Sequence, residues 1–179
     1  MDELLEILAA MAGARERADN PRELFLDMCE RVVKYAAGAF GARTDEVAML
    51  FLTSDEKHLR FAAPRRFADL GTIPVTKRDS IAVNIFGKKV GEAMNNVPMV
   101  KHVAFFESVK LRDRAVPIQK MITVPILNGE DAVGVAQISR KGETAAEAGP
   151  DFSQADVNRA QELFEAVAPY LVQARPDRF

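Results

Sequence analysis

Two apolar runs, 119–127 and 132–139, flank a short polar stretch that contains Asn128-Gly129. An Asn-Gly pair between two such runs is the strongest short-range signal for a β-hairpin, because a tight hairpin turn needs residues that accept positive φ angles. A second pair of runs, Glu46–Thr53 and His58–Ala63, is joined by a short polar turn. The sequence therefore predicts two antiparallel hairpins, and the chain has to fold around a β-sheet.

Helical periodicity precedes these strands. Apolar residues recur at helical spacing between Leu4 and Met11. Asn20-Pro21 then combines an N-cap side chain with a proline at the first helical position. This start signal predicts a second helix, which we expect to end near Gly38 or Gly41.

Two further helices are expected after the first hairpin. Ser80 is predicted to cap a short helix, Ile81–Phe86, that ends at Gly87. Ser153 and Asp156 have the spacing of a capping box and predict the start of the last helix. Its apolar positions lie three or four residues apart: Val157, Ala160, Phe164, Val167 and Leu171.

The stretch between the two hairpins is less regular. Ile73–Thr76 and Val90–Val97 are interpreted as short strands, the second at an edge of the sheet. Met99–Leu111 has enough apolar residues for a loose helix, within an irregular connection bounded by Pro98 and Pro117. Long connections of this kind are often functional.

Charge and composition exclude several classes of protein. The net charge of −2 gives the chain no electrostatic reason to bind nucleic acid. The segment 77–120 carries an excess of five positive charges, which is either a solvated face or a cationic rim that favours anionic ligands. An acidic N-terminus argues against a signal peptide, and no apolar run is long enough to span a membrane. We therefore expect a cytoplasmic protein.

The residue patterns of common catalytic sites are absent from the sequence. There is no phosphate-binding glycine loop and no nucleophile elbow. His58 and His102 are far apart and have no neighbouring His or Cys, so no metal site is expected. Cys29, the single cysteine, lies beside the apolar stripe of its helix and is interpreted as a buried structural thiol. We expect a protein without catalytic activity, and an enzyme of unknown type stays open.

The order of the predicted elements resembles that of a GAF domain, a small-molecule sensory and regulatory module. The resemblance is carried by three segments: Lys120–Ile126, Ala132–Ile138 and Phe152–Asp156. It implies an α+β, GAF-like (PAS/profilin-like) fold with an antiparallel sheet of about five to six strands, flanked by helices. The N- and C-terminal helices would pack together on one face. The implied organisation is an N-terminal helix over 1–18, one domain over 19–173 and a tail over 174–179.

The same resemblance bears on ligands and activity. GAF domains that bind cyclic GMP carry an Asn-Lys pair and a Phe-x-x-x-Asp-Glu motif. Here Arg140 replaces the Asn and Val157 replaces the Glu, so cyclic GMP is not favoured and the cofactor stays unknown. The retained Lys141 and Asp156 would form a clamp between the last strand and the last helix. Relatives that reduce free methionine sulfoxide use several cysteines, so that activity is not expected.

A GAF-like fold implies a ligand pocket between the sheet and the segment 80–111. The predicted ligand-binding residues combine polar groups with apolar walls: Ser80, Ile81, Asn84, Asn95, Val97, His102, Phe105, Thr123 and Gln137. Local structural roles are the alternatives, a helix cap for Ser80 and a turn for Asn95.

Two functions follow from these observations. The first is a non-catalytic regulatory domain in bacterial-type signal transduction, which binds an unidentified small molecule and relays its state through the terminal helices. The second is a dimerisation or adaptor domain whose pocket is degenerate. In either case we expect a homodimer, with a signalling protein as a possible partner and no contact with nucleic acid or membrane.

Overall fold

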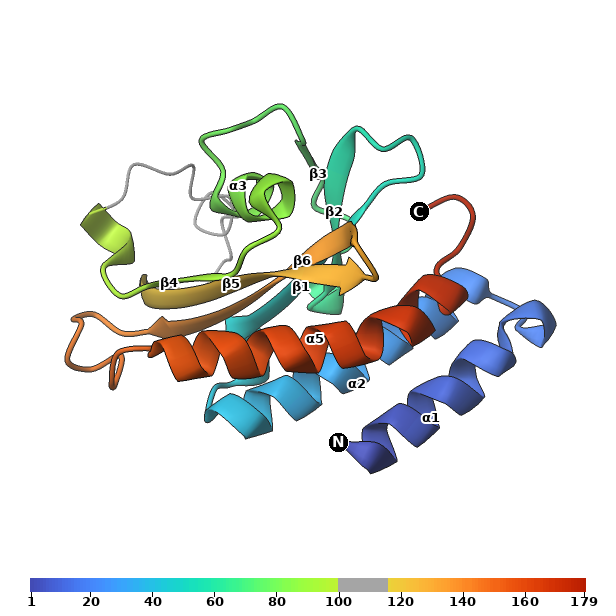
Figure 1. The fold of residues 1–179 in the computed structure, drawn as a ribbon, viewed down its shortest axis with the longest axis horizontal. Helices are drawn as coiled ribbons and strands as arrows, with labels where there is room; N and C mark the ends of the chain where they lie inside the picture. The colour runs from blue at the N-terminus through green and yellow to red at the C-terminus, as the bar shows by residue number, and fades with distance from the viewer. Residues whose placement is uncertain (100–115) are drawn as a thin grey trace.

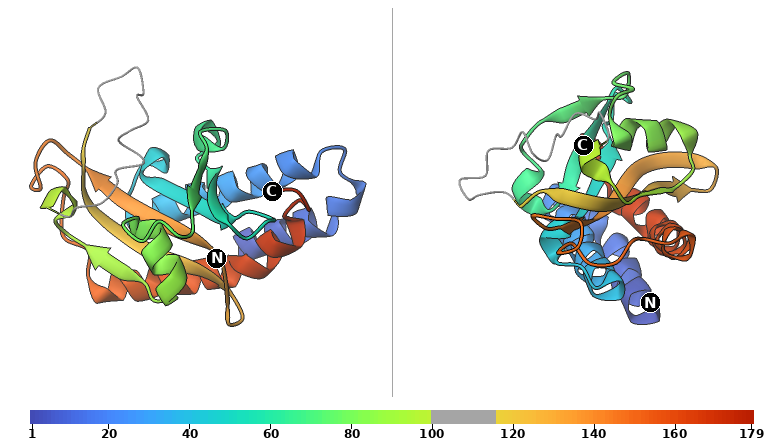
Figure 2. Two further views of the ribbon diagram at one scale, coloured as in Figure 1. Left: turned by 90° about the horizontal axis from the view of Figure 1, so that it is seen from above. Right: turned by 90° about the vertical axis from the view of Figure 1, so that its left-hand side faces the viewer.

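The structure is a computed structural model, and it describes residues 1–99 and 116–179. The described residues form three layers (Figure 1). A six-stranded sheet lies in the middle, two long helices cover one face with the N-terminal helix packed against them, and a short helix lies on the opposite face. Figure 2 shows the same layers from above and from one side. The expected α+β fold is confirmed.

The chain begins with two α-helices, and two groups of three strands follow, each with an α-helix after it. The four described α-helices are α1 (Asp2–Gly13), α2 (Pro21–Phe40), α3 (Ile81–Lys88) and α5 (Gln154–Ala174). The strands are β1 (Val47–Leu52), β2 (His58–Ala63), β3 (Thr72–Pro74), β4 (Glu92–Met94), β5 (Ile118–Asn128) and β6 (Asp131–Lys141). Single turns of 3-10 helix lie at η1 (Arg15–Arg17), η2 (Thr44–Glu46), η3 (Arg65–Phe67) and η4 (Val97–Met99).

The strands run in the order β3-β2-β1-β6-β5-β4, and every neighbouring pair is antiparallel. Both predicted hairpins, β1–β2 and β5–β6, are present. The pairing of β1 with β6 joins them into one sheet and brings Ala48 opposite Gln137. The short strands β3 and β4 form the two edges, as the sequence analysis expects for β4.

The larger core lies between the sheet and the helix layer. The predicted stripe of α5 is buried along its whole length, and α5 packs against α1, α2 and β5. Leu4 and Leu8 of α1 are buried in the same core. The terminal helices therefore pack together, as the resemblance implies. In the described part of the chain, no helix has the length and apolar character needed to cross a bilayer.

A smaller core lies on the other face of the sheet, which we call the α3 face. It contains Ala48, Leu50 and Val135 of the sheet together with Ala82 and Val83 of α3. Figure 1 shows α3 above β5 and β6, and α3 packs against both strands. This arrangement leaves α3 on the face where the sequence analysis expects a ligand pocket.

Several predicted start and stop signals are confirmed. The Asn20 side chain accepts a hydrogen bond from the Glu23 N–H, and α2 ends at Gly41 in the left-handed conformation. Ser153 and Asp156 form the expected capping box. Ser80 caps α3 by accepting from the Val83 N–H.

Two local predictions are wrong. Helix α3 does not end at Gly87 but continues to Lys88, and Lys89 adopts the left-handed conformation at φ 57°. The β5–β6 turn is formed by Gly129 and Glu130, because Asn128 is still paired with Asp131. A break in the β5–β6 register just before the turn offsets the two strands, and this offset moves the turn by one residue.

Candidate functional site

Two polar side chains, those of Thr123 and Gln137, are buried near the middle of the α3 face. They lie opposite each other on β5 and β6, and only 2% and 5% of their surfaces are exposed. The Gln137 Nε2 donates a hydrogen bond to the Thr123 Oγ1 at 3.3 Å. The structure therefore brings together two of the residues predicted from the sequence.

The orientation of the pair follows from strand alternation. Directly opposed residues of an antiparallel sheet share a face, and Gln137 is opposite Ala48, which belongs to the α3-face core. The neighbouring residues Ile122 and Ile138 point the other way, into the helix-layer core. Thr123 and Gln137 are thus on the face covered by α3.

A charged residue that the sequence analysis did not select belongs to the same cross-strand row. Glu92 of β4 is opposite Thr123, so its side chain is on the α3 face as well. Its carboxylate pairs with the Lys88 Nζ at 3.0 Å. Lys88 and Lys89 belong to the basic segment, and both side chains have intramolecular partners: Lys88 pairs with Glu92, and the Lys89 Nζ donates to the Glu130 carbonyl. The row Glu92–Thr123–Gln137 could be found only once the register was known.

Contacts within the described part of the chain use only part of the hydrogen-bonding capacity of the pair. A side-chain amide can donate two hydrogen bonds and accept two, and a hydroxyl can donate one and accept two. Among residues 1–99 and 116–179, the bond between Gln137 and Thr123 is the single hydrogen bond that either side chain makes.

The predicted residues of α3 lie at the start of that helix. Ser80 is buried and acts as the N-cap, Ile81 is half-buried, and Asn84 is exposed. The Asn84 Nδ2 donates to the Arg78 carbonyl. These contacts order the loop that leads into α3, and they give Ser80 the capping role that the sequence analysis left open.

Asn95 lies apart from the Thr123–Gln137 pair. Its Nδ2 donates to the Phe152 carbonyl at 2.9 Å, and its Oδ1 accepts from the Phe152 N–H at 2.8 Å. Val97 is buried in η4. His102 and Phe105 lie outside the described residues.

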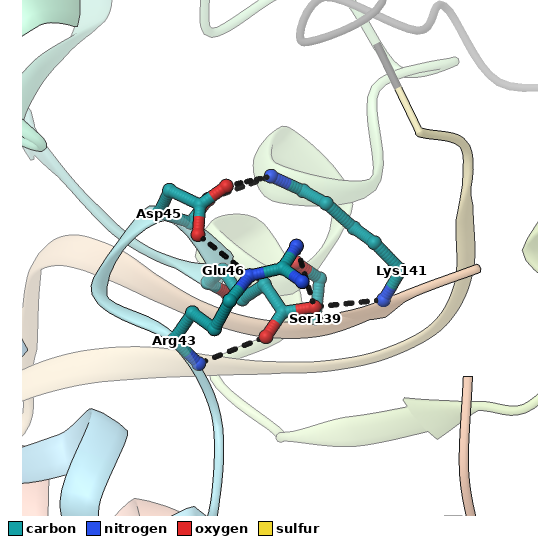
Figure 3. Close-up of polar contacts among 5 residues, drawn as sticks. All are labelled: Arg43, Asp45, Glu46, Ser139 and Lys141. Carbon is teal, nitrogen blue, oxygen red and sulfur yellow. Dashed lines mark hydrogen bonds and ion pairs between the residues drawn. The ribbon is translucent and has the colours of Figure 1, made fainter. Parts of the chain in front are cut away.

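A second polar cluster ties the end of β6 to the loop before β1 (Figure 3). The buried Glu46 carboxylate accepts from the backbone N–H groups of Arg43 and Lys141, and the Ser139 hydroxyl donates to the Glu46 carbonyl. The Lys141 Nζ lies 3.0 Å from the Asp45 Oδ2. Every polar group of Glu46 in this cluster has an intramolecular partner, so the cluster has the character of a structural anchor.

The cluster corrects one prediction. Lys141 pairs with Asp45 and not with Asp156, because β6 ends beside the loop that precedes β1. The Asp156 carboxylate instead accepts from the backbone N–H and the hydroxyl of Ser153, and these two bonds lower its pKa. Sequence reasoning missed the anchor because it depends on the pairing of β1 with β6.

Among the residues that the structure describes, groups suited to covalent chemistry are not gathered at this site. Cys29 is fully buried in α2 within the helix-layer core. Burial raises the pKa of its thiol well above the usual value, which suppresses the reactive thiolate. The predicted burial of this thiol is confirmed. Within residues 1–99 and 116–179, no three His, Cys, Asp or Glu side chains are arranged to hold a metal ion.

Solved structures share this fold at low sequence identity. The GAF domain of a phosphoenolpyruvate-protein phosphotransferase from Coxiella burnetii has a TM-score of 0.65 at 12% identity, covering 96% of this chain and 94% of that one. The corresponding domain from Acinetobacter gives 0.63 at 11%, with coverages of 97% and 95%. The free methionine-R-sulfoxide reductase from Neisseria meningitidis, solved in complex with its substrate, gives 0.58 at 15%, with coverages of 96% and 90%.

These likenesses define a class by fold. No protein-family model matches the sequence, and no curated protein matches it. The chain has the fold of GAF domains, which is shared by sensory and regulatory domains and by free methionine-R-sulfoxide reductases.

Proposed function

We propose that this chain is a non-catalytic, ligand-sensing regulatory domain. It binds a small molecule on the α3 face of the sheet and relays the bound state through its terminal helices, in the cytoplasm. The observation that carries the proposal is the buried, hydrogen-bonded Thr123–Gln137 pair among the apolar residues of the α3 face. A few polar groups that converge among apolar walls are the general form of a small-molecule site.

The α3 side supplies the apolar walls of the proposed site. Ile81 and Val97 were predicted as wall residues, and the core of Leu50 and Val135 continues the apolar surface. Ser80 and Asn84 order the start of α3. His102 and Phe105 are included in the proposed site on the basis of the sequence alone. A ligand that offers a hydrogen-bond donor and an acceptor side by side would complement the Gln137 amide.

Non-catalytic action is proposed on chemical grounds. The reductases with this fold act on free methionine sulfoxide, as their names state. In this chain the single cysteine is buried on the opposite side of the sheet from the proposed site. A thiol there has no route to a ligand on the α3 face.

A thermal-shift screen with metabolites and nucleotides tests the proposal. A ligand at 100 times its Kd stabilises the folded state by about 2.7 kcal/mol. Gln137→Leu removes the amide without changing the side-chain length greatly, and we expect it to weaken binding about tenfold, which is about 1.4 kcal/mol. Gln161→Leu is the matched control, because Gln161 belongs to α5 and bonds Pro125 and Glu165.

The outcomes are distinct. A hit whose Kd rises in Gln137→Leu and is unchanged in Gln161→Leu supports the proposal. A hit with the same Kd in all three proteins would place the ligand elsewhere, and a broad library without a hit would favour the adaptor function. The homodimer stays a prediction, to be checked by light scattering, since Leu4 and Leu8 of α1 already pack within one chain.

A further inference from the structure

Strand β4 lies between the proposed site and the start of the last helix. Its pairing partner is β5, with Glu92 opposite Thr123 and Met94 opposite Met121. It also contacts α5. A single three-residue strand therefore touches both the ligand-site row and the helix that the proposed function uses for relay.

Alternation along β4 gives each side of the strand a different contact. Glu92 is on the α3 face, in the row of Thr123 and Gln137. Gly91, one residue earlier, packs toward the helix layer: a Cβ built on it would lie 2.8 Å from the Val124 Cγ1 and 3.1 Å from the Val157 Cγ1. Only glycine allows β4 to approach the first turn of α5 this closely.

The other end of β4 holds the residue that precedes the N-cap of α5. Asn95 follows β4 directly, and its amide bonds both the N–H and the carbonyl of Phe152. Phe152 is buried and immediately precedes Ser153, the N-cap. The backbone position at which α5 begins is thus fixed to the end of β4 by two hydrogen bonds.

The loop before α5 is also held from β5 and β6, on the same side of the sheet. The Lys120 Nζ donates to the Gly149 carbonyl at 2.6 Å and pairs with Asp151 at 2.7 Å. The Arg140 guanidinium lies 4.0 Å from the centre of the Phe152 ring. With this loop anchored to β5 and β6, a shift of β4 against β5 acts on the loop through the Asn95–Phe152 hydrogen bonds.

From these contacts we propose that β4 couples the Thr123–Gln137 site to the first turn of α5, with Asn95 as the positioning residue. The proposal rests on the proposed function for its biological meaning. A change at Thr123 alters how β4 sits on β5, and the Asn95–Phe152 bonds pass that change to the N-terminus of α5. Coupling between sites requires such a contiguous element whose position both sites influence.

The coupling can be measured without a ligand. Thr123→Val perturbs the site by removing the hydroxyl while keeping the side-chain shape. Amide hydrogen exchange at Val157 and Asn158, read by NMR, reports on the first turns of α5. We expect Thr123→Val to change these exchange rates about threefold or more in the otherwise unaltered chain.

Two backgrounds separate coupling from simple fraying. Asn95→Ala breaks the link, and in this background Thr123→Val should leave the Val157 and Asn158 rates unchanged. Ser153→Ala frays the same helix end through its cap without touching β4, and in this background the Thr123→Val effect should persist. The same effect in Asn95→Ala as in the unaltered chain, or no effect in the unaltered chain, would overturn the proposal.

The outcome of this experiment and the outcome of the ligand screen are independent of each other. A ligand screen without a hit would reject ligand sensing and leave the measured coupling unaffected. A confirmed ligand together with unchanged α5 exchange in Thr123→Val would reject β4 as the relay and leave binding intact.

Discussion

Two glycines, one directly before β4 and one within α3, show how local space decides which glycines the fold needs. Gly91 sits against Val124 and Val157, whose branched side chains have few alternative rotamers. Gly87 lies inside α3, and a Cβ added there would meet nothing within 4 Å. The same chemical change should therefore have opposite effects at these two positions.

Gly91→Ala is expected to destabilise the fold by about 1–3 kcal/mol, because the new methyl group overpacks the contact between β4 and α5. Gly87→Ala, the matched control, is expected to stabilise it by up to about 1 kcal/mol, since alanine favours a helix. Urea unfolding of both variants measures the difference. Equal effects of the two substitutions would contradict the close packing of β4 against α5.

At the residue scale, individual side chains could be selected from the sequence, but the residues that lie beside them in the fold could not. Gln137 was identifiable as an amide within an apolar strand, and Ser80 as a cap. That Thr123 faces Gln137, and that Glu92 extends the row, depends on the exact pairing of β4, β5 and β6. Asn95 was selected from the sequence as a ligand residue, whereas the structure engages its amide with Phe152.

At the scale of elements, the anchor in Figure 3 holds the end of β6 beside the start of β1. Burial alone would raise the pKa of Asp45, but hydrogen bonds from Lys141 and Arg43 outweigh burial and lower it. Because the pKa of this carboxyl group is lower in the folded state, the charged carboxylate stabilises the fold at pH values above its ordinary pKa of 3.8. This stabilisation is lost as the pH falls through the folded-state pKa.

Asp45→Asn should therefore lower the free energy of unfolding at pH 7 by less than about 1 kcal/mol, since the carboxylate is partly exposed. The deficit relative to the unaltered chain should shrink as the pH is lowered from about 5 to about 2. Asp131→Asn, at the exposed opposite end of β6, is the control. Denaturant unfolding across this pH range measures the difference in unfolding free energy between Asp45→Asn and the unaltered chain. A difference that is constant with pH would contradict the proposed role of the anchor.

Element boundaries were predictable where local chemistry decides them, as at Asn20 and Ser153. They were not predictable where pairing decides them. The β5–β6 turn lies at Gly129-Glu130, one residue later than predicted, because the strand register shifts just before it. Lys141 pairs with Asp45 because β1 and β6 are neighbours in the sheet. Both outcomes depend on contacts between segments that are distant in the sequence.

At the scale of the whole molecule, the two faces of the sheet have different compositions. The helix-layer core is apolar and includes Cys29 and the stripe of α5. The α3 face combines apolar residues with the Thr123–Gln137 pair. Departures from purely apolar packing in a core are expected mainly at functional sites. This asymmetry is the physical basis for placing the ligand on the α3 face.

The most direct test of that placement is a titration followed by the side-chain NH₂ resonances of Gln137, assigned by their loss in Gln137→Leu. The titrant is the best hit of the thermal-shift screen. The account predicts saturable shifts of these two resonances with the Kd of the thermal hit, while the side-chain NH₂ of Gln161 stays in place. Saturable binding that leaves the Gln137 resonances unmoved would contradict it.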